Sequence, residues 1–137
     1  MPSRPPKIVP LPARPEAAGP PDPPAFLDAR AREEWARIAP ALWRSGRLPP
    51  VAVGPLAAYA AAFSRWRAAE EEIAREAAAG ESEDDGLIVV SLYSGRPRAN
   101  PLLKEAATAC REMVRYAAQF AMTPVSRTAI GNSAAHR

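Results

Sequence analysis

The amino-acid sequence predicts a mainly α-helical protein: a helical hairpin and a third long helix, with a small β-hairpin between helices two and three and a short C-terminal helix. Apolar residues recur at helical spacing over three long stretches. Alanine, the residue with the highest helix propensity, supplies much of the 47% apolar content. One short β-branched run, residues 87–90, separates the second stretch from the third and favours a strand.

Composition divides the chain into three parts. Residues 1–25 hold ten of the seventeen prolines and are expected to form a disordered arm, because neighbouring prolines favour extended geometry and remove backbone donors. Residues 26–130 are expected to form one helical domain, and residues 131–137 a disordered tail. The arm is either a passive tail or an arm that holds DNA. Its basic residues are Arg4, Lys7 and Arg14.

The first helix is expected from about Asp28 to about Ser45. Asp28 is a preferred N-cap residue, and Gly46 suits the end of the helix. Pro40 cannot donate to the carbonyl of Ala36, so we expect a kink or a break there. The apolar stripe of this helix comprises Leu27, Ala31, Trp35, Ile38 and Leu42.

The second helix is expected to begin near Pro49-Pro50, where proline is tolerated, and to end at about Ala79, before Gly80. A helix of this kind commonly forms an antiparallel hairpin with the helix before it. Its second half is charged and is expected to extend into solvent. Its apolar stripe comprises Leu56, Tyr59, Ala60, Phe63, Trp66, Ile73 and Ala77.

A change of character follows the second helix. Residues 81–86 are expected to form an acidic loop, and residues 87–90 a strand that turns at residues 93–96 and returns through residues 97–99. An isolated hairpin is barely stable in water, so this one is expected to pack on another element or on a neighbouring subunit.

Asparagine followed by proline marks the start of the third helix. Asn100 is a preferred N-cap residue and Pro101 suits the first helical position, so a helix is expected from Pro101 to about Phe120. Thr123-Pro124 repeats this pattern and predicts a short last helix that ends before Gly131.

The sequence lacks the residues of several function classes. No glycine-rich loop precedes a Lys-Ser or Lys-Thr pair, as phosphate loops require. The one histidine, His136, lies in the expected tail, where a catalytic base would be poorly positioned. Cys110, the one cysteine, is expected in the core, and a single cysteine and histidine cannot build a zinc site. We therefore expect no catalytic residue, no metal site and no cofactor.

No stretch is long and apolar enough to span a bilayer, and the N-terminus has no apolar run of the kind that a signal peptide needs. We therefore expect a cytoplasmic protein without a membrane partner.

The charges are segregated along the chain. The charged residues within 70–85 are mostly acidic, and the charged residues from Arg96 onward are mostly basic. Opposite poles suit a protein that meets two kinds of surface, or copies of itself head to tail. Solvated helix faces would give the same pattern.

The order of these features resembles one known family. It runs from a helix centred on Trp35, through an Ala/Tyr-rich helix and a glycine-bounded hairpin, to Asn100-Pro101 and an amphipathic helix that closes in Phe-Ala-Met-Thr-Pro-Val-Ser-Arg, residues 120–127. This order resembles the small subunit of phage terminases, in the branch with Asn-Pro before the third helix and a Thr-Pro-x-Ser-Arg-like ending. The resemblance covers about residues 26–130. Ala121-Met122 stands where the family pattern usually has Gly-Leu.

The resemblance implies a non-catalytic DNA-recognition and regulatory subunit. Such proteins form an oligomeric ring, bind double-stranded viral DNA and deliver it to a large subunit that holds the ATPase and nuclease. The expected DNA contacts are Arg4, Lys7, Arg14, Arg30, Arg32 and Arg37. The expected contacts with a neighbouring copy or the large subunit are Glu83, Asp84, Asp85, Arg96, Arg98, Val125, Arg127 and Ile130.

Other interpretations stay open. The three arginines of the first helix would also be explained by solubility and by ion pairs with Glu33 or Glu34. A small helical DNA-binding transcriptional regulator is the alternative function, and a dimer rather than a ring would favour it. A structural adaptor that never contacts DNA is a third class.

Overall fold

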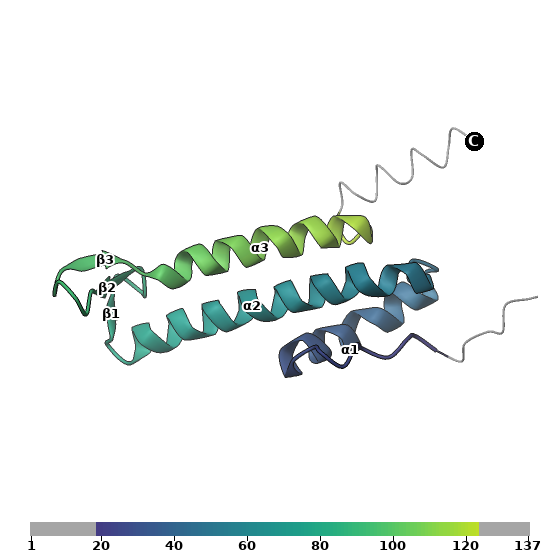
Figure 1. Cartoon of the computed structure of the whole chain (residues 1–137), viewed down its shortest axis with the longest axis horizontal. Coiled ribbons are helices and arrows are strands. Elements are labelled where there is room, and N and C mark those ends of the chain that lie inside the picture. Colours follow the sequence, from purple (N-terminus) through teal and green to yellow (C-terminus); the bar gives the residue numbers. More distant parts are fainter. Residues whose placement is uncertain (1–18, 124–137) are drawn as a thin grey trace, which may run out of the picture.

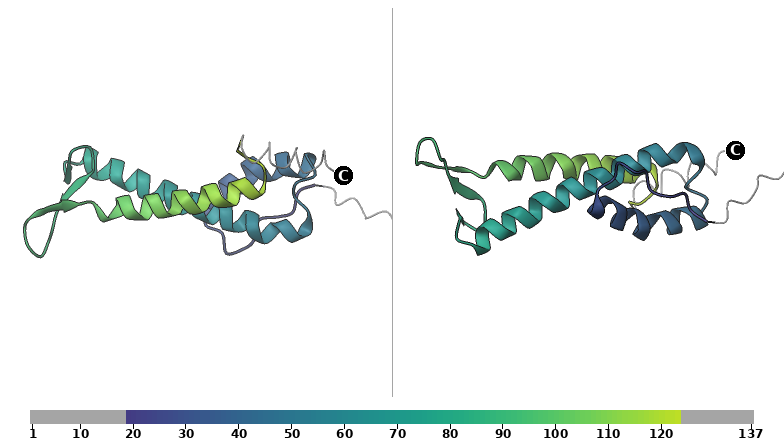
Figure 2. Two further views of the ribbon diagram at one scale, coloured as in Figure 1. Left: turned by 90° about the horizontal axis from the view of Figure 1, so that it is seen from above. Right: turned by 60° about the horizontal axis from the view of Figure 1, so that its bottom comes forward.

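The computed structural model describes residues 19–123, which form three α-helices and a small sheet. The long helices α2 and α3 lie side by side and antiparallel along the length of the molecule (Figures 1 and 2). Helix α1 packs at one end of this pair, and the sheet lies at the other end. The elements are α1 (Ala29–Arg44), the 3₁₀ turn η1 (Pro50–Ala52), α2 (Val53–Ala78), β1 (Ser82–Glu83), β2 (Ile88–Val90), β3 (Pro97–Ala99) and α3 (Pro101–Gln119).

This arrangement confirms the predicted fold class and the order of its elements. The expected arm up to residue 18 and the expected last helix and tail from residue 124 lie outside the described residues. Residues 19–25, which the sequence assigned to the arm, contact the helical domain. The indole Nε1 of Trp35 donates to the carbonyl of Pro21 at 3.1 Å.

The structure corrects three local predictions. Helix α1 is not broken at Pro40; Ala36 is exposed, so water can bind the carbonyl that lacks a donor. The predicted acidic loop contains the short strand β1, so the sheet has three antiparallel strands in the order β1-β2-β3. The charged second half of α2 does not extend alone into solvent, because α3 lies along it.

Two clusters form the core. The larger one lies where α1 crosses the first half of α2, and Phe120 closes it from the end of α3. The smaller one lies farther along the α2–α3 pair and centres on Ala69, Ile73 and Ala106. Its larger side chains other than Ile73, which are Trp66, Leu102 and Leu103, are only partly buried, so it buries less apolar area than the first cluster. The far half of the helix pair therefore depends on polar contacts as well.

Asn100 joins the far ends of α2 and α3 to the sheet. Its side-chain oxygen accepts from Leu102 N at 3.0 Å and so caps α3. Its Nδ2 donates to Glu76 Oε2 on α2 at 2.6 Å and to the Gly86 carbonyl at 2.9 Å. Its backbone N–H donates to the Leu87 carbonyl at 2.8 Å. This buried residue thus ties together three elements that the chain connects only through turns.

Gly86 allows the sheet to approach α2 closely. Its φ is +92°, a conformation that favours glycine. A Cβ at this position would lie 2.6 Å from Ile73 Cγ2 and 3.0 Å from the Ile73 carbonyl oxygen. A larger residue would therefore push the β1–β2 turn away from α2.

All three described α-helices end in the same kind of turn. A residue in the left-handed region follows each C-cap, and the next residue donates back to the helix, which is a Schellman motif. The left-handed residues are Gly46 (φ 69°), Gly80 (φ 70°) and Ala121 (φ 53°). The closing bonds run from Arg47 N to Leu42 O (2.8 Å), from Glu81 N to Glu76 O (2.9 Å) and from Met122 N to Ala117 O (3.2 Å).

Replacement of Asn100 by alanine is expected to lower the free energy of unfolding by about 2–4 kcal/mol, because it removes the cap and leaves two buried groups without their donor. Urea denaturation at fixed protein concentration measures this. Ser45→Ala is the matched control, since Ser45 Oγ donates to a helix-end carbonyl at an exposed site. Equal stability of the two variants would contradict the role of Asn100.

Candidate nucleic-acid interface

The three arginines that the sequence proposed as DNA contacts on α1 all have partners within the chain. Arg30 donates to Glu71 on α2 through Nε at 3.1 Å and Nη2 at 2.8 Å. Arg32 donates to two backbone carbonyls of the segment before α1, each at 2.8 Å. Arg37 donates to Glu34 at 2.7 and 2.6 Å. Arg30 therefore joins α1 to α2, Arg32 holds the preceding segment against α1, and Arg37 pairs within α1.

Glu34 is the centre of a buried polar contact between α1 and α2. Its carboxylate accepts from Tyr59 Oη at 2.7 Å as well as from Arg37. Burial, and then the hydrogen bond to Glu34, raise the pKa of Tyr59 well above its usual value. The hydrogen bond with Glu34 likewise raises the pKa of Arg37. The predicted pairing of an α1 arginine with Glu34 is thus present, and it gives a buried carboxylate a hydrogen-bond partner.

Two of the four carboxylates of α2, Glu71 and Glu72, also form ion pairs inside the chain. Arg67 Nε donates to Glu71 at 2.6 Å, and Arg75 donates to Glu72 at 2.7 Å and to Glu81 at 3.0 Å. The hydrogen bonds from Arg30 and then Arg67 lower the pKa of Glu71, and the hydrogen bond with Arg75 lowers the pKa of Glu72. The bonds to Glu72 and then Glu81 raise the pKa of Arg75. The α2 surface therefore offers little unpaired negative charge to a neighbour.

The outer face of α3 carries basic side chains without a carboxylate partner among residues 19–123. Lys104, Arg111 and Arg115 are exposed and follow each other at spacings of seven and four residues, so they lie on one side of the helix. Arg111 donates to the Thr108 hydroxyl at 3.3 Å, and Arg115 lies 5.2 Å from the ring centre of Tyr116. Because these contacts are neutral, the face stays positive. We call these three residues the α3 basic face.

The carboxylates of α3 lie away from this face. Glu112 pairs with Arg65 of α2 at 2.9 Å, and Glu105 lies with them in a groove between the two helices. The excess of basic residues from Arg96 onward is visible in the sequence, but the division of α3 into a basic face and an acidic face is not visible from composition alone. The seven-and-four spacing opposite the apolar stripe was the signal that could have found the basic face.

The structure gathers five predicted contact residues on the small sheet at the end of the α2–α3 pair. We call this sheet, residues 82–99, the tip. The turn after β1 holds Asp84 and Asp85, both with φ 53°, which aspartate tolerates better than most residues. Leu92 and Tyr93 are fully exposed in the next turn. The charged residues of the tip are Glu83, Asp84, Asp85, Arg96 and Arg98. The tip thus combines both signs of charge with exposed apolar side chains.

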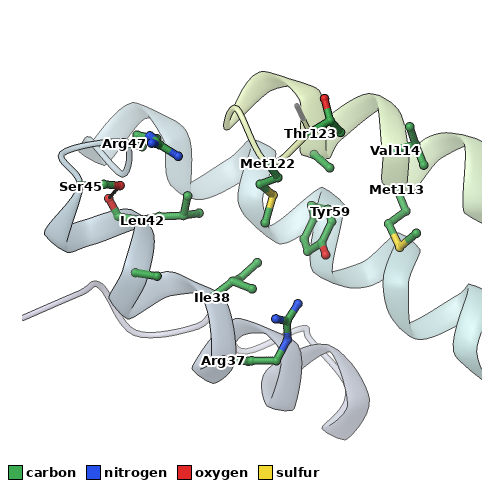
Figure 3. A pocket seen from close by; sticks show the side chains of 12 residues that line it. Arg37, Ile38, Leu42, Ser45, Arg47, Tyr59, Met113, Val114, Met122 and Thr123 are labelled. Atoms are coloured by element: carbon green, nitrogen blue, oxygen red, sulfur yellow. Dashed lines mark hydrogen bonds between the residues drawn. The ribbon is translucent and has the colours of Figure 1, made fainter. Parts of the chain in front are cut away.

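An open groove of ≈ 510 Å³ lies at the opposite end, where α1, α2 and the turn after α3 meet (Figure 3). Ile38, Tyr59, Met113 and Met122 point into it, and Arg37 lies at its edge. Arg37 is already paired with Glu34, so the groove is an apolar surface rather than a cluster of free polar groups.

Other kinds of site are not evident in the part of the chain that the structure describes. Within residues 19–123, no group of three or more His, Cys, Asp or Glu side chains is placed to hold a metal ion. None of the helices described is sufficiently long and apolar to cross a bilayer. Six proposed contact residues lie outside the described range: Arg4, Lys7, Arg14, Val125, Arg127 and Ile130.

Together these features define a small helical protein with unpaired charge on two surfaces, the tip and the α3 basic face. Residues 31–136 match the family model for the small subunit of phage terminase. This match covers more than half of the chain, and the chain therefore belongs to the phage terminase small-subunit family. Comparisons with curated proteins and with solved structures give no match.

Arg37→Gln is expected to lower the free energy of unfolding by about 1–3 kcal/mol, because it leaves the buried Glu34 carboxylate without its charged partner. Arg30→Gln is the matched control, since it breaks an ion pair that is exposed on both sides. Thermal and urea denaturation should place Arg30→Gln close to the unmodified protein. If Arg37→Gln is as stable as Arg30→Gln, the buried contact is not structural.

Proposed function

We propose that this protein is the non-catalytic DNA-recognition and regulatory subunit of a phage DNA-packaging terminase. In this role it forms a homo-oligomeric ring, binds double-stranded phage DNA and delivers the DNA to the large subunit that holds the ATPase and nuclease. The family match over residues 31–136 carries the proposal. The segregated charge of the described surface supports it, because a subunit of this kind needs separate surfaces for copies of itself and for DNA.

The tip is the surface that we assign to protein contacts. Most of the α2 carboxylates are satisfied within the chain, so electrostatic matching between neighbours has to use the unpaired charges of the tip. The exposed Leu92 and Tyr93 add apolar area to the same surface. A surface that meets a different surface on the next copy generates a closed ring when its rotation closes. The partner of the tip is therefore a neighbouring copy or the large subunit.

Native mass spectrometry is expected to show an oligomer of more than two copies, with one sharp mass, because a ring closes at a fixed number. Light scattering over a range of protein concentrations checks the same property in solution. A stable dimer would instead favour the alternative function, a small DNA-binding transcriptional regulator.

Neutralisation of the acidic side of the tip should weaken assembly. Glu83→Gln with Asp84→Asn and Asp85→Asn removes three charges, and asparagine suits the left-handed φ of the turn where lysine would strain it. Exposed ion pairs contribute about 0.2–1 kcal/mol each, so the concentration for half-assembly should rise roughly tenfold. Sedimentation velocity at low salt measures this.

The control for the tip variant removes the same charge elsewhere. Asp22→Asn, Glu33→Gln and Glu70→Gln are exposed positions outside the tip and should leave the oligomer unchanged. If both variants assemble like the unmodified protein, or both weaken equally, the tip is not the charged contact.

A further inference from the structure

We infer that the α3 basic face, formed by Lys104, Arg111 and Arg115, binds the phosphate backbone of duplex DNA. This inference rests on the proposed function, that the chain binds DNA, and assigns the contact to a helix that sequence analysis did not select. It moves the contact away from α1, whose arginines Arg30 and Arg37 are held in ion pairs with carboxylates.

The positive charge of the α3 basic face has no carboxylate partner within the described residues. None of the ion pairs among residues 19–123 includes any of the three side chains. On a second copy, Glu71 and Glu72 already pair with arginines of their own chain, whereas Glu70 and the acids of the tip have no ion-pair partner among residues 19–123. The complement of the α3 basic face is therefore an anion from outside the chain.

The length of the α3 basic face matches the spacing of phosphates along a duplex. Eleven residues separate Lys104 from Arg115, so the face extends about 16 Å along the helix axis. Duplex DNA carries a phosphate on each strand about every 3.4 Å along its axis, so the face spans roughly five base-pair steps.

The residues beside the α3 basic face suit a duplex better than a single strand. Ala107 and Ala118 lie beside the face and are exposed, and their small side chains leave room for a backbone to approach. Tyr116 is half-buried and lies beside Arg115, and so is not an open stacking platform. Binding of single strands without sequence preference uses exposed aromatic rings. The α3 basic face lacks such rings and therefore suits a duplex backbone.

The position of Lys104 also argues against a purely structural role. It lies in the first turn of α3, at the positive end of the helix dipole, where a cation is unfavourable. A nearby phosphate would reverse this effect, since the same helix end favours negative charge.

The test uses the full-length protein and a fluorescently labelled duplex, with affinity measured by anisotropy over a range of salt concentrations. The face variant carries Lys104→Gln, Arg111→Gln and Arg115→Gln. Loss of three phosphate contacts should reduce the slope of log K against log salt by about 2.7 and weaken binding roughly 500-fold at 0.1 M salt. Circular dichroism and native mass should match the unmodified protein, because glutamine keeps helix propensity and the sites are exposed.

The control variant removes the same total charge from α2. It carries Arg65→Gln, Arg67→Gln and Arg75→Gln, three arginines that pair with carboxylates of the same chain. This variant should keep the slope of the unmodified protein. An equal loss in both variants would mean that net charge alone controls binding, and would overturn the assignment.

Two further outcomes separate this inference from the proposed function. If the unmodified protein binds duplex and the face variant keeps its slope, the assignment to α3 is wrong while DNA binding stands. If the unmodified protein binds no duplex even at low salt, the proposed function fails together with the inference. Binding of poly-glutamate as tightly as duplex at the same salt would instead make the α3 basic face a site for acidic proteins.

Discussion

The α2–α3 pair depends on the buried side chain of Asn100. Beyond the α1 end, the two helices meet in a small cluster with three buried residues, Ala69, Ile73 and Ala106, so apolar burial there contributes less than at the α1 end. Asn100 supplies the missing restraint, because one amide caps α3 and donates to both Glu76 and the Gly86 carbonyl. Its cap sets where α3 begins, and its bond to Glu76 sets where that start lies along α2. These two constraints decide which residues of α3 face the core and which face solvent.

At the other end of the pair, a charged contact and a helix-ending turn serve the same purpose. Glu34 accepts from Tyr59 and Arg37, so a buried carboxylate fixes the position of α1 on α2. The turn after α3 folds Phe120 into the core around them. Ala121 occupies the left-handed position of this turn with φ 53°. The two preceding helices use glycine at the equivalent position, so the geometry, rather than the residue type, is what the fold requires.

Local chemistry explains why the helices were predictable and the contacts between them were not. Asp28 and Asn100 act through neighbours a few residues away, so their caps could be read from the sequence. The strand β1 could not, because two residues carry no periodicity and pair only once β2 has been placed beside them. The partners of the charged residues were equally hidden. Arg30 and Glu71 lie forty-one positions apart, and only the packing of α1 on α2 brings them together.

Pairing inside the chain changes what the charge pattern means. The sequence shows an acidic stretch facing a basic stretch, which suggests that copies attract each other through both. In the fold, arginines at positions 30, 67 and 75 pair with three of the eight carboxylates of that stretch, Glu71, Glu72 and Glu81, whereas the cations of α3 meet only neutral groups. The negative partner of the α3 basic face therefore lies outside the subunit. The acids of the tip have no ion-pair partner among residues 19–123, and these charges can take part in assembly. Ion pairs within α2 and between α1 and α2 thus leave a surface suited to protein separate from a surface suited to a polyanion.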